Sequence, residues 1–254
     1  MARGPRMRLT VIGCSGSLPG PDSPASCYLV EADGFRATLD LGSGALGPLQ
    51  RHCAIGDLDA VLLSHLHPDH CMDVLPLYVA RTYDPDRRDG RMPVHGPRGA
   101  GAHLAGAYGR HEEPGLSGAF DFVEWVAGRQ QVGPFEVTVA RMVHPVETWA
   151  MRIEHRGRSL VYSADTGPCD RLVELAGGAD LLLCEASYQE GQTNPADLHL
   201  TGRQAGEHAS RAAVGRLVLT HIPPWYDHGQ TEAEARSSFD GPLELARSGS
   251  SYEI

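Results

Sequence analysis

Short apolar runs, separated by segments rich in glycine and proline, recur along the whole chain. Runs of this kind between turn residues, either alternating or continuously apolar, are typical of β-strands. The pattern predicts strands over residues 8–12, 27–31, 35–40, 60–64, 92–95, 120–126, 135–142, 149–155, 159–163, 181–184 and 216–220.

Apolar residues at a helical spacing indicate a smaller number of helices. They predict helices over residues 46–51, 71–82, 168–176, 201–213 and 231–239. The helix from Thr201 is the clearest, because threonine is a favourable N-cap and alanines follow along one face. Residues 81–118 are the least regular stretch, and we interpret them as a lid or a dimer contact.

The order of these elements indicates the fold class. Both halves of the chain place several strands in a row and then alternate strands with helices. This order favours an α/β fold in which two mixed β-sheets face each other and helices cover the outside. With 254 residues, 41% of them hydrophobic, the chain can bury a sizeable core. We expect one domain over residues 1–254, with residues 1–6 disordered.

Charge and cysteine content narrow the class of protein. The 32 acidic residues outnumber the 22 basic ones, for a net charge of −10. Such a surface repels polyphosphate, so we expect no stable nucleic-acid partner. No apolar run approaches the roughly 18 residues of a membrane-spanning helix, and we expect no membrane partner. Six cysteines without a C-x-x-C pair or a signal peptide are typical of reduced thiols in a cytoplasmic protein.

The stretch His65-Leu66-His67-Pro68-Asp69-His70 carries the strongest chemical signal. It directly follows the predicted strand over residues 60–64, where a buried element meets an open edge. His65 and His67 are two positions apart, so their imidazoles point the same way in an extended chain. Asp69 could also serve as a helix cap. Three histidines and one aspartate in six residues nevertheless favour a metal site.

Further candidate ligands lie where later predicted strands end. His144, Asp165 and His221 each directly follow, or end, an apolar β run. Together with the first motif they make seven ligands, which is too many for one tetrahedral ion. The set suits two ions that share a bridging carboxylate.

These motifs resemble the metallo-β-lactamase superfamily, whose pattern is H-x-H-x-D-H followed by His, Asp and His on later strands. The glycine turn at residues 13–16, Glu185-Ala186-Ser187 and His199-Leu200-Thr201 are similar to its ribonuclease Z-like branch. Within that branch the chain most resembles bacterial atypical class II cyclic-AMP phosphodiesterases. The shared stretches are G-P-D-S-P-A-S, S-H-L-H-x-D-H, D-L-H-L-[ST]-G and T-H-I-P-P-W.

The resemblance implies a four-layer αβ/βα sandwich, a homodimer, and two divalent metal ions per chain, zinc before manganese. It also implies how the ligands divide. One ion takes His65, His67 and His144, the other takes Asp69, His70 and His221, and Asp165 bridges the two.

Candidate catalytic residues follow from the same resemblance. Two divalent ions would bring the pKa of the water that bridges them near neutrality, so that it is available as hydroxide. They would also neutralise the charge on the phosphoryl oxygens. His199 is the candidate acid for the leaving alkoxide or a phosphate contact, and Glu185 is the partner that orients it. Asp69 serves as both a metal ligand and a proton relay. Ser26, His199 and Trp225 are candidate substrate contacts, the last because an indole can stack on a base.

We therefore predict a metal-dependent phosphodiesterase for a small phosphodiester, 3′,5′-cyclic AMP or a related cyclic nucleotide. A ribonuclease Z-like RNA 3′-processing endonuclease is the first alternative. That family inserts a long arm before the bridging aspartate, whereas two predicted strands nearly fill the segment between His144 and Asp165. A lactonase or thioester hydrolase is a second alternative, because the metal motif alone does not exclude it. The complete ligand set argues against a scaffold without catalysis.

Overall fold

The computed structural model describes residues 7–86 and 88–254. The predicted disorder of residues 1–6 lies outside these described residues. The assignment of the whole chain to one domain stays a prediction.

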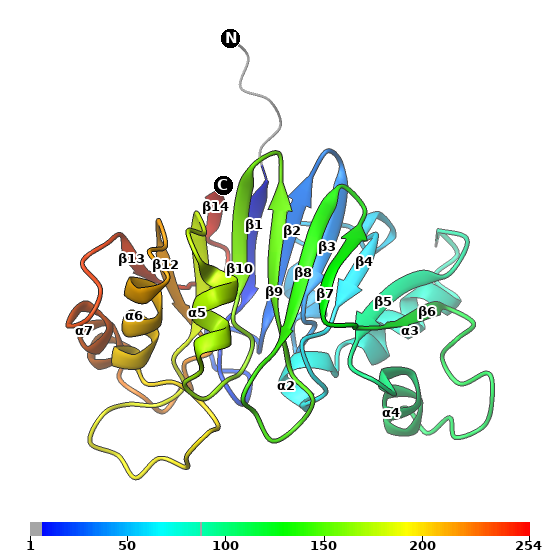
Figure 1. Cartoon of the computed structure of the whole chain (residues 1–254). Helices are drawn as coiled ribbons and strands as arrows, with labels where there is room; N and C mark the ends of the chain where they lie inside the picture. Colours follow the sequence, from blue (N-terminus) through cyan, green and yellow to red (C-terminus); the bar gives the residue numbers. More distant parts are fainter. Residues whose placement is uncertain (1–6, 87) are drawn as a thin grey trace.

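Two seven-stranded β-sheets face each other at the centre of the molecule (Figure 1). The first sheet has the order β14-β1-β2-β3-β4-β5-β6. Its strands are β1 (Arg8–Gly13), β2 (Cys27–Ala32), β3 (Phe35–Leu39), β4 (Ala60–Leu62), β5 (Met92–Gly96), β6 (Phe120–Glu124) and β14 (Ser251–Glu253). Neighbours are antiparallel from β14 to β3 and parallel from β3 to β6.

The second sheet repeats this arrangement with the order β13-β12-β11-β10-β9-β8-β7. Its strands are β7 (Gly128–Val132), β8 (Phe135–Arg141), β9 (Trp149–His155), β10 (Arg158–Tyr162), β11 (Leu181–Glu185), β12 (Leu217–Thr220) and β13 (Leu243–Leu245). An antiparallel meander from β7 to β10 is followed by parallel strands from β10 to β13. The predicted pair of mixed sheets is therefore confirmed.

Helices form the two outer layers (Figure 1). The first sheet is covered by α1 (Leu46–Leu49), a 3₁₀ turn η1 (Ile55–Asp57), α2 (Pro68–Cys71), α3 (Val74–Tyr83) and α4 (Ala100–Ala107). The second sheet is covered by α5 (Asp170–Ala176), α6 (Gly202–Arg211) and α7 (His228–Arg236). None of the described helices is long and apolar enough to cross a membrane.

The core between the sheets explains why buried and partly exposed residues alternate along a strand. In β8 the residues Phe135, Val137 and Val139 are buried, and the residues between them are partly exposed. These side chains join Tyr28 and Leu39 of the first sheet in one apolar cluster. Removing such side chains from water is the main force that holds the sheets together.

Three strands, the helix α4 and the 3₁₀ turn η1 were not predicted. Strand β7 reads Gly-Arg-Gln-Gln-Val and buries only its final valine, so it lacks the apolar pattern of a strand; its pairing with β8 stabilises it. Strands β13 and β14 have three residues each. Helix α4 lies within the irregular stretch 81–118 and is built from alanine and glycine around buried Leu104. Glycine lowers helix propensity, so packing decides its structure.

Candidate metal centre

All seven predicted ligands meet at one edge of the sandwich. One group contains His65, His67, His144 and Asp165, and a second contains Asp69, His70 and His221. Within each group the ligand atoms lie within 4.8 Å of one another. A third group of Asp165, His199 and His221 overlaps these two, so Asp165 lies close to ligand atoms of both.

The first sheet supplies four of these residues from one turn. Strand β4 ends at Leu62, and helix α2 begins at Pro68. Between them, Nε2 of His65 lies 3.1 Å from Nδ1 of His67. Asp69 does not cap α2, because it lies inside the helix and its Oδ2 is 3.0 Å from Nε2 of His221.

The second sheet supplies one residue from each of three segments. His144 follows β8, Asp165 follows β10 and His221 follows β12. Ala164 and His221 have φ values of 52° and 56°, in the left-handed region. That conformation is costly for residues other than glycine and often occurs at functional sites. It turns the chain sharply where each strand delivers its ligand.

Hydrogen bonds at the outer nitrogens determine which imidazole nitrogen faces the cluster. Nδ1 of His144 lies 3.0 Å from the carbonyl oxygen of Leu198, and Nδ1 of His70 lies 2.7 Å from Oδ2 of Asp40. Both oxygens can only accept, so each Nδ1 carries the proton. Nε2 of His144 therefore presents a lone pair to the cluster, and Nε2 of His70 faces the cluster as well, where a metal ion would take the place of a second proton.

Serine hydroxyls act in the same way on two other histidines. Ser64 Oγ donates to Asp40 and lies 3.0 Å from Nδ1 of His65. Ser187 Oγ donates to the carbonyl oxygen of His221 and lies 2.7 Å from Nδ1 of that ring. Since each hydroxyl hydrogen is already used, each serine accepts from Nδ1. Such partners orient metal-binding histidines in proteins.

The inner atoms are spaced as ligands of one ion are spaced. Nδ1 of His67 is 3.1 Å from Nε2 of His65 and 3.3 Å from Nε2 of His144, and Nε2 of His70 is 3.1 Å from Nε2 of His221. Tetrahedral zinc with Zn–N bonds of about 2.0–2.1 Å separates its ligands by about 3.3–3.4 Å. Lone pairs that face one another repel unless a cation lies between them. The residues present therefore fit divalent metal ions.

Asp165 lies between the two groups. Its Oδ2 is 3.6 Å from Nε2 of His65, and its Oδ1 is 3.3 Å from Nε2 of His70. Oδ1 is buried and accepts no hydrogen bond from any described residue. A buried carboxylate oxygen without a donor is costly, and a metal ion would satisfy it.

The electrostatics of the cluster also favour cations. Burial lowers the pKa of His65, His67 and His144 and keeps these imidazoles in the neutral form that ligates metals. Burial acts against protonation of His70 too, yet Asp165 and Asp40 raise its pKa well above the usual value. Burial disfavours ionisation of Asp165, but the facing imidazoles of His221, His70 and His65 hold its pKa well below the usual value.

Asp40 is a central residue that the sequence analysis missed. Its carboxylate is fully buried and accepts from Ser64 N at 2.6 Å, from Ser64 Oγ, from Nδ1 of His70 and from the Tyr162 hydroxyl at 2.7 Å. A signal was available, because Asp40 ends a predicted strand just as Asp165 follows one. It was not used because Asp40 lies outside the metal motifs.

His199 lies beside the ligands and is held by Glu185. Glu185 Oε1 is 2.9 Å from Nδ1 of His199 and also accepts from Thr166 N, while Oε2 accepts from Ser187 N and Leu200 N. Burial would lower the pKa of His199, but the charge and hydrogen bond of Glu185 and the charge of Asp165 raise it to about 9. The structure thus brings both residues to the cluster in the predicted pairing.

The two remaining substrate candidates lie in different environments. Ser26 is fully buried, and its Oγ lies 3.5 Å from the Tyr28 hydroxyl. Because its side chain is fully buried, Ser26 presents no surface to a substrate. Trp225 is 59% exposed, which leaves its indole free to contact a ligand.

Comparison with known proteins identifies the family. A model of the Beta-lactamase superfamily domain matches residues 35–222. The chain belongs to the metallo-β-lactamase superfamily. This assignment agrees with the cluster of His and Asp residues that could hold metal ions. The protein is a metallo-hydrolase of the ribonuclease Z-like branch.

The similarity to individual relatives covers nearly the whole of this metallo-hydrolase. An uncharacterized protein of Mycobacterium leprae is 46% identical, over 98% of this chain and 89% of its own length. A ribonuclease Z of Mycobacterium bovis is 31% identical, over 94% of this chain and 95% of its own length. YhfI of Bacillus subtilis, named a probable metallo-hydrolase, is 31% identical, over 97% of this chain and 100% of its own length. The crystal structure of YhfI superimposes with a TM-score of 0.87 at 30% identity, over 98% and 100% of the chains.

Proposed function

We propose that this metallo-hydrolase is a phosphodiesterase for small substrates, with 3′,5′-cyclic AMP or a related cyclic nucleotide as its substrate. Two divalent ions, zinc before manganese, would be held by the two groups of residues that Asp165 separates. When bound, they supply the charge that acidifies water and neutralises phosphoryl oxygens. We propose a cytoplasmic homodimer as the working form.

The pairing of His199 with Glu185 is the observation that carries this proposal. An alkoxide leaving group needs a proton, and a positioned imidazole is a common donor. Glu185 accepts from Nδ1 of His199, so Nε2 is the nitrogen left to donate to the leaving oxygen. Glu185 is itself anchored by three backbone N–H groups, which makes it a positioning residue with little freedom to move.

Asp69 has a second proposed role as a proton relay. It is buried, and its Oδ2 faces His221 and His70 at 3.0 and 3.5 Å. Trp225 has the proposed role of an aromatic contact for the substrate, because its indole is exposed shortly after the ligand His221 in the chain. An aromatic ring in that position can stack on a base.

An RNA 3′-processing endonuclease is the second candidate, favoured by the likeness to a ribonuclease Z. Two features support the small substrate instead. The segment between His144 and Asp165 consists of β9, β10 and short connections, so it contains no extended arm. The net charge of −10 opposes a polynucleotide, whose affinity depends on basic contacts.

The test is hydrolysis of 3′,5′-cyclic AMP by metal-loaded protein, with product AMP measured by chromatography. Precursor transfer RNA, a lactone, a thioester and bis(4-nitrophenyl) phosphate are assayed in parallel. Release of AMP that is faster than turnover of the other substrates supports the proposal. Preferred cleavage of RNA at low and moderate salt, or of the lactone or thioester, would contradict it.

A further inference from the structure

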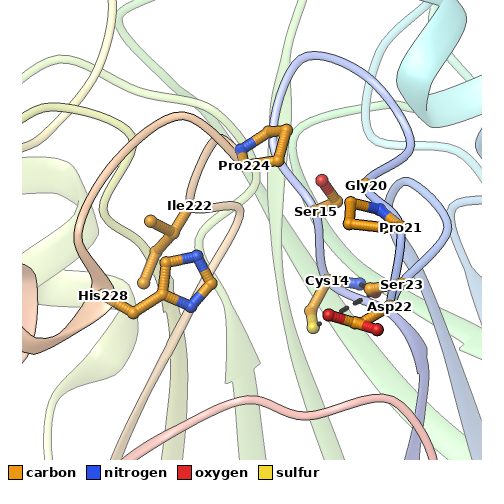
Figure 2. A pocket seen from close by; sticks show the side chains of 9 residues that line it. All are labelled: Cys14, Ser15, Gly20, Pro21, Asp22, Ser23, Ile222, Pro224 and His228. Carbon is orange, nitrogen blue, oxygen red and sulfur yellow. Dashed lines mark hydrogen bonds between the residues drawn. The ribbon is translucent and has the colours of Figure 1, made fainter.

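The loop over residues 14–20 lies against the segment that starts with His221. His221 N donates to the carbonyl oxygen of Cys14 at 3.0 Å, and Gly16 N donates to that of Ile222 at 3.2 Å. Figure 2 shows this loop and the side chain of Ile222 on opposite sides of a pocket. The residues that line the pocket include no predicted metal ligand, so the loop meets the metal centre at another point.

Ser17 connects this loop to the metal centre. Its backbone N–H donates to Nε2 of His221 at 3.4 Å. The same imidazole nitrogen lies 3.0 Å from Oδ2 of Asp69 and 3.1 Å from Nε2 of His70. The N–H of Ser17 is therefore aimed at the group of ligands that contains Asp69, His70 and His221.

The direction of this N–H is fixed by its surroundings. Ser17 has a φ of 64°, in the left-handed region that is unfavourable for serine. A Cβ on Gly16 would lie 2.2 Å from the carbonyl oxygen of His221, so the close approach requires glycine. Leu18 N donates to the carbonyl oxygen of Gly16 at 2.7 Å, and Ser15 Oγ donates to that of Leu18 at 2.7 Å. Backbone strain that neighbouring contacts maintain is often part of a functional site.

A metal ion held by His221 would leave this N–H without its acceptor. Nδ1 of His221 donates to Ser187 Oγ, so Nε2 has a single lone pair. An ion takes that lone pair, and the N–H of Ser17 then needs another acceptor. Ser17 is exposed, so that acceptor can arrive from solvent. Backbone N–H groups of tight turns are common donors to phosphate oxygens.

We propose that the backbone N–H of Ser17 donates a hydrogen bond to a non-bridging phosphoryl oxygen of the substrate at the metal centre. The proposal rests on the proposed function, because it adds a substrate contact to the same site. It also gives the glycine turn at residues 13–16 a role, which is to bring this N–H to the centre. The contact complements those proposed for His199, which protonates the leaving oxygen, and for Trp225, which contacts the base.

Binding of inorganic phosphate tests the contact without any hydrolysis. The full chain, labelled with ¹⁵N-serine and loaded with zinc, is titrated with phosphate while amide NMR spectra are recorded. Ser17→Gly identifies the signal of Ser17 by its disappearance. We expect the Ser17 amide proton to move downfield, because a charged acceptor makes a stronger hydrogen bond than the neutral ring of His221.

The matched control in these spectra is the amide of Ser159, at the other end of β10 from Asp165, which should not move. A Ser17 signal that stays in place while phosphate binds would overturn the proposal. Zinc-loaded protein that binds no phosphate would overturn it as well.

Two substitutions at position 17 separate the N–H from the side chain. Ser17→Gly keeps the N–H and the left-handed turn, whereas a β-branched valine disfavours this conformation and moves the N–H. For bis(4-nitrophenyl) phosphate we expect kcat/KM of Ser17→Val to lie at least about tenfold below that of Ser17→Gly. Arg156, with a φ of 50° in the turn between β9 and β10, is the matched position, where the valine and glycine variants should have equal kcat/KM. Equal values for the two Ser17 variants would contradict the proposal.

An ester in place of the peptide bond before residue 17 removes the N–H alone and covers the case in which valine displaces the loop. Incorporation of glyceric acid, the hydroxy-acid analogue of serine, introduces it. We expect kcat/KM to fall about 10²-fold at unchanged zinc content, a usual loss for one such donor. An ester protein as active as the serine protein would refute the contact. If wild-type protein hydrolyses no diester, the proposed function fails, and the phosphate titration still decides whether the N–H of Ser17 binds a phosphoryl oxygen.

Discussion

The two halves of the metal cluster are assembled in opposite ways. The first sheet supplies His65 and His67 from the turn after β4, and Asp69 and His70 from the short helix α2 that follows directly. The second sheet supplies three residues from the ends of three different strands. The ligands of the first sheet come together once one short segment adopts its backbone conformation. The ligands of the second sheet come together only when the strand register and the packing of the two sheets are both correct.

Two buried tyrosines connect these halves beneath the metal centre. The Tyr162 hydroxyl, from the strand that leads to Asp165, donates to Asp40 in the first sheet at 2.7 Å. The Tyr28 hydroxyl, from the first sheet, lies 2.7 Å from Oγ1 of Thr220, the residue before His221. The two rings are 5.2 Å apart. Each hydrogen bond therefore joins one sheet to a strand end of the other.

Removing the carboxylate shared by both halves should have the largest effect. We expect Asp165→Ala to reduce the rate by about 10³-fold or more, because charge stabilisation at both groups of ligands depends on it. Metal content by mass spectrometry should fall in the same variant. Asp121→Ala removes an exposed carboxylate of β6 and should leave both quantities unchanged. Wild-type metal content and rate in Asp165→Ala would refute the bridging role.

A variant of His199 tests whether the second sheet contributes a proton donor to the site in addition to metal ligands. We expect His199→Ala to lower kcat for an alkoxide leaving group by about 10²–10³-fold, within the range for general acids. The loss should be much smaller with bis(4-nitrophenyl) phosphate, because nitrophenolate leaves without a proton. Stopped assays on the two substrates measure this difference. An equal loss on both would mean that His199 does not act as the acid.

The hydrogen bonds of the two buried tyrosines should strengthen metal binding, although the tyrosines are not themselves ligands. We expect Tyr162→Phe to weaken metal binding about 10–100-fold, the usual effect of losing a partner behind a ligand. Competition with a chelator measures the affinity. The matched control is Tyr78→Phe, a buried tyrosine of α3 that packs against Tyr108. Equal affinities in the two variants would show that the cross-sheet bond plays no part in metal binding.

The smallest expected effect concerns the cap of α6. Thr201 Oγ1 accepts from Gln204 N at 3.2 Å, and the Gln204 side chain accepts from Thr201 N at 2.9 Å. We expect Thr201→Ala to lower the free energy of unfolding by about 1 kcal/mol, measured by urea denaturation. Thr201→Ser keeps the hydroxyl and should restore most of the loss. A stability of Thr201→Ala equal to wild type would show that the cap contributes little.

Much of the fold could be predicted from periodicity. The eleven predicted strands, the helix after Thr201 and the pairing of two mixed sheets are confirmed. Strand β7 and helix α4 were missed because their residues carry little apolar pattern. Their structure depends on neighbours that are distant in the sequence, and a local pattern contains no information about such neighbours.

The candidate site shows the same division. Spacing in the first motif and the ends of later strands were enough to name seven residues that the structure brings together. Asp40, Ser64 and Ser187 were not named, although they set the proton on three of the imidazoles. Their contacts depend on which strand ends lie side by side.

The sequence by itself determined the local half of the centre, because the backbone period places His65 and His67 on one side of a short turn. It also determined the family, through motifs spread along the chain. Only the tertiary structure decided which nitrogen of each ring faces inward and which side chains, such as Asp40 and Ser187, hold the rings from behind. Those properties depend on distances between segments far apart in the chain, and only the packing of the two sheets sets these distances.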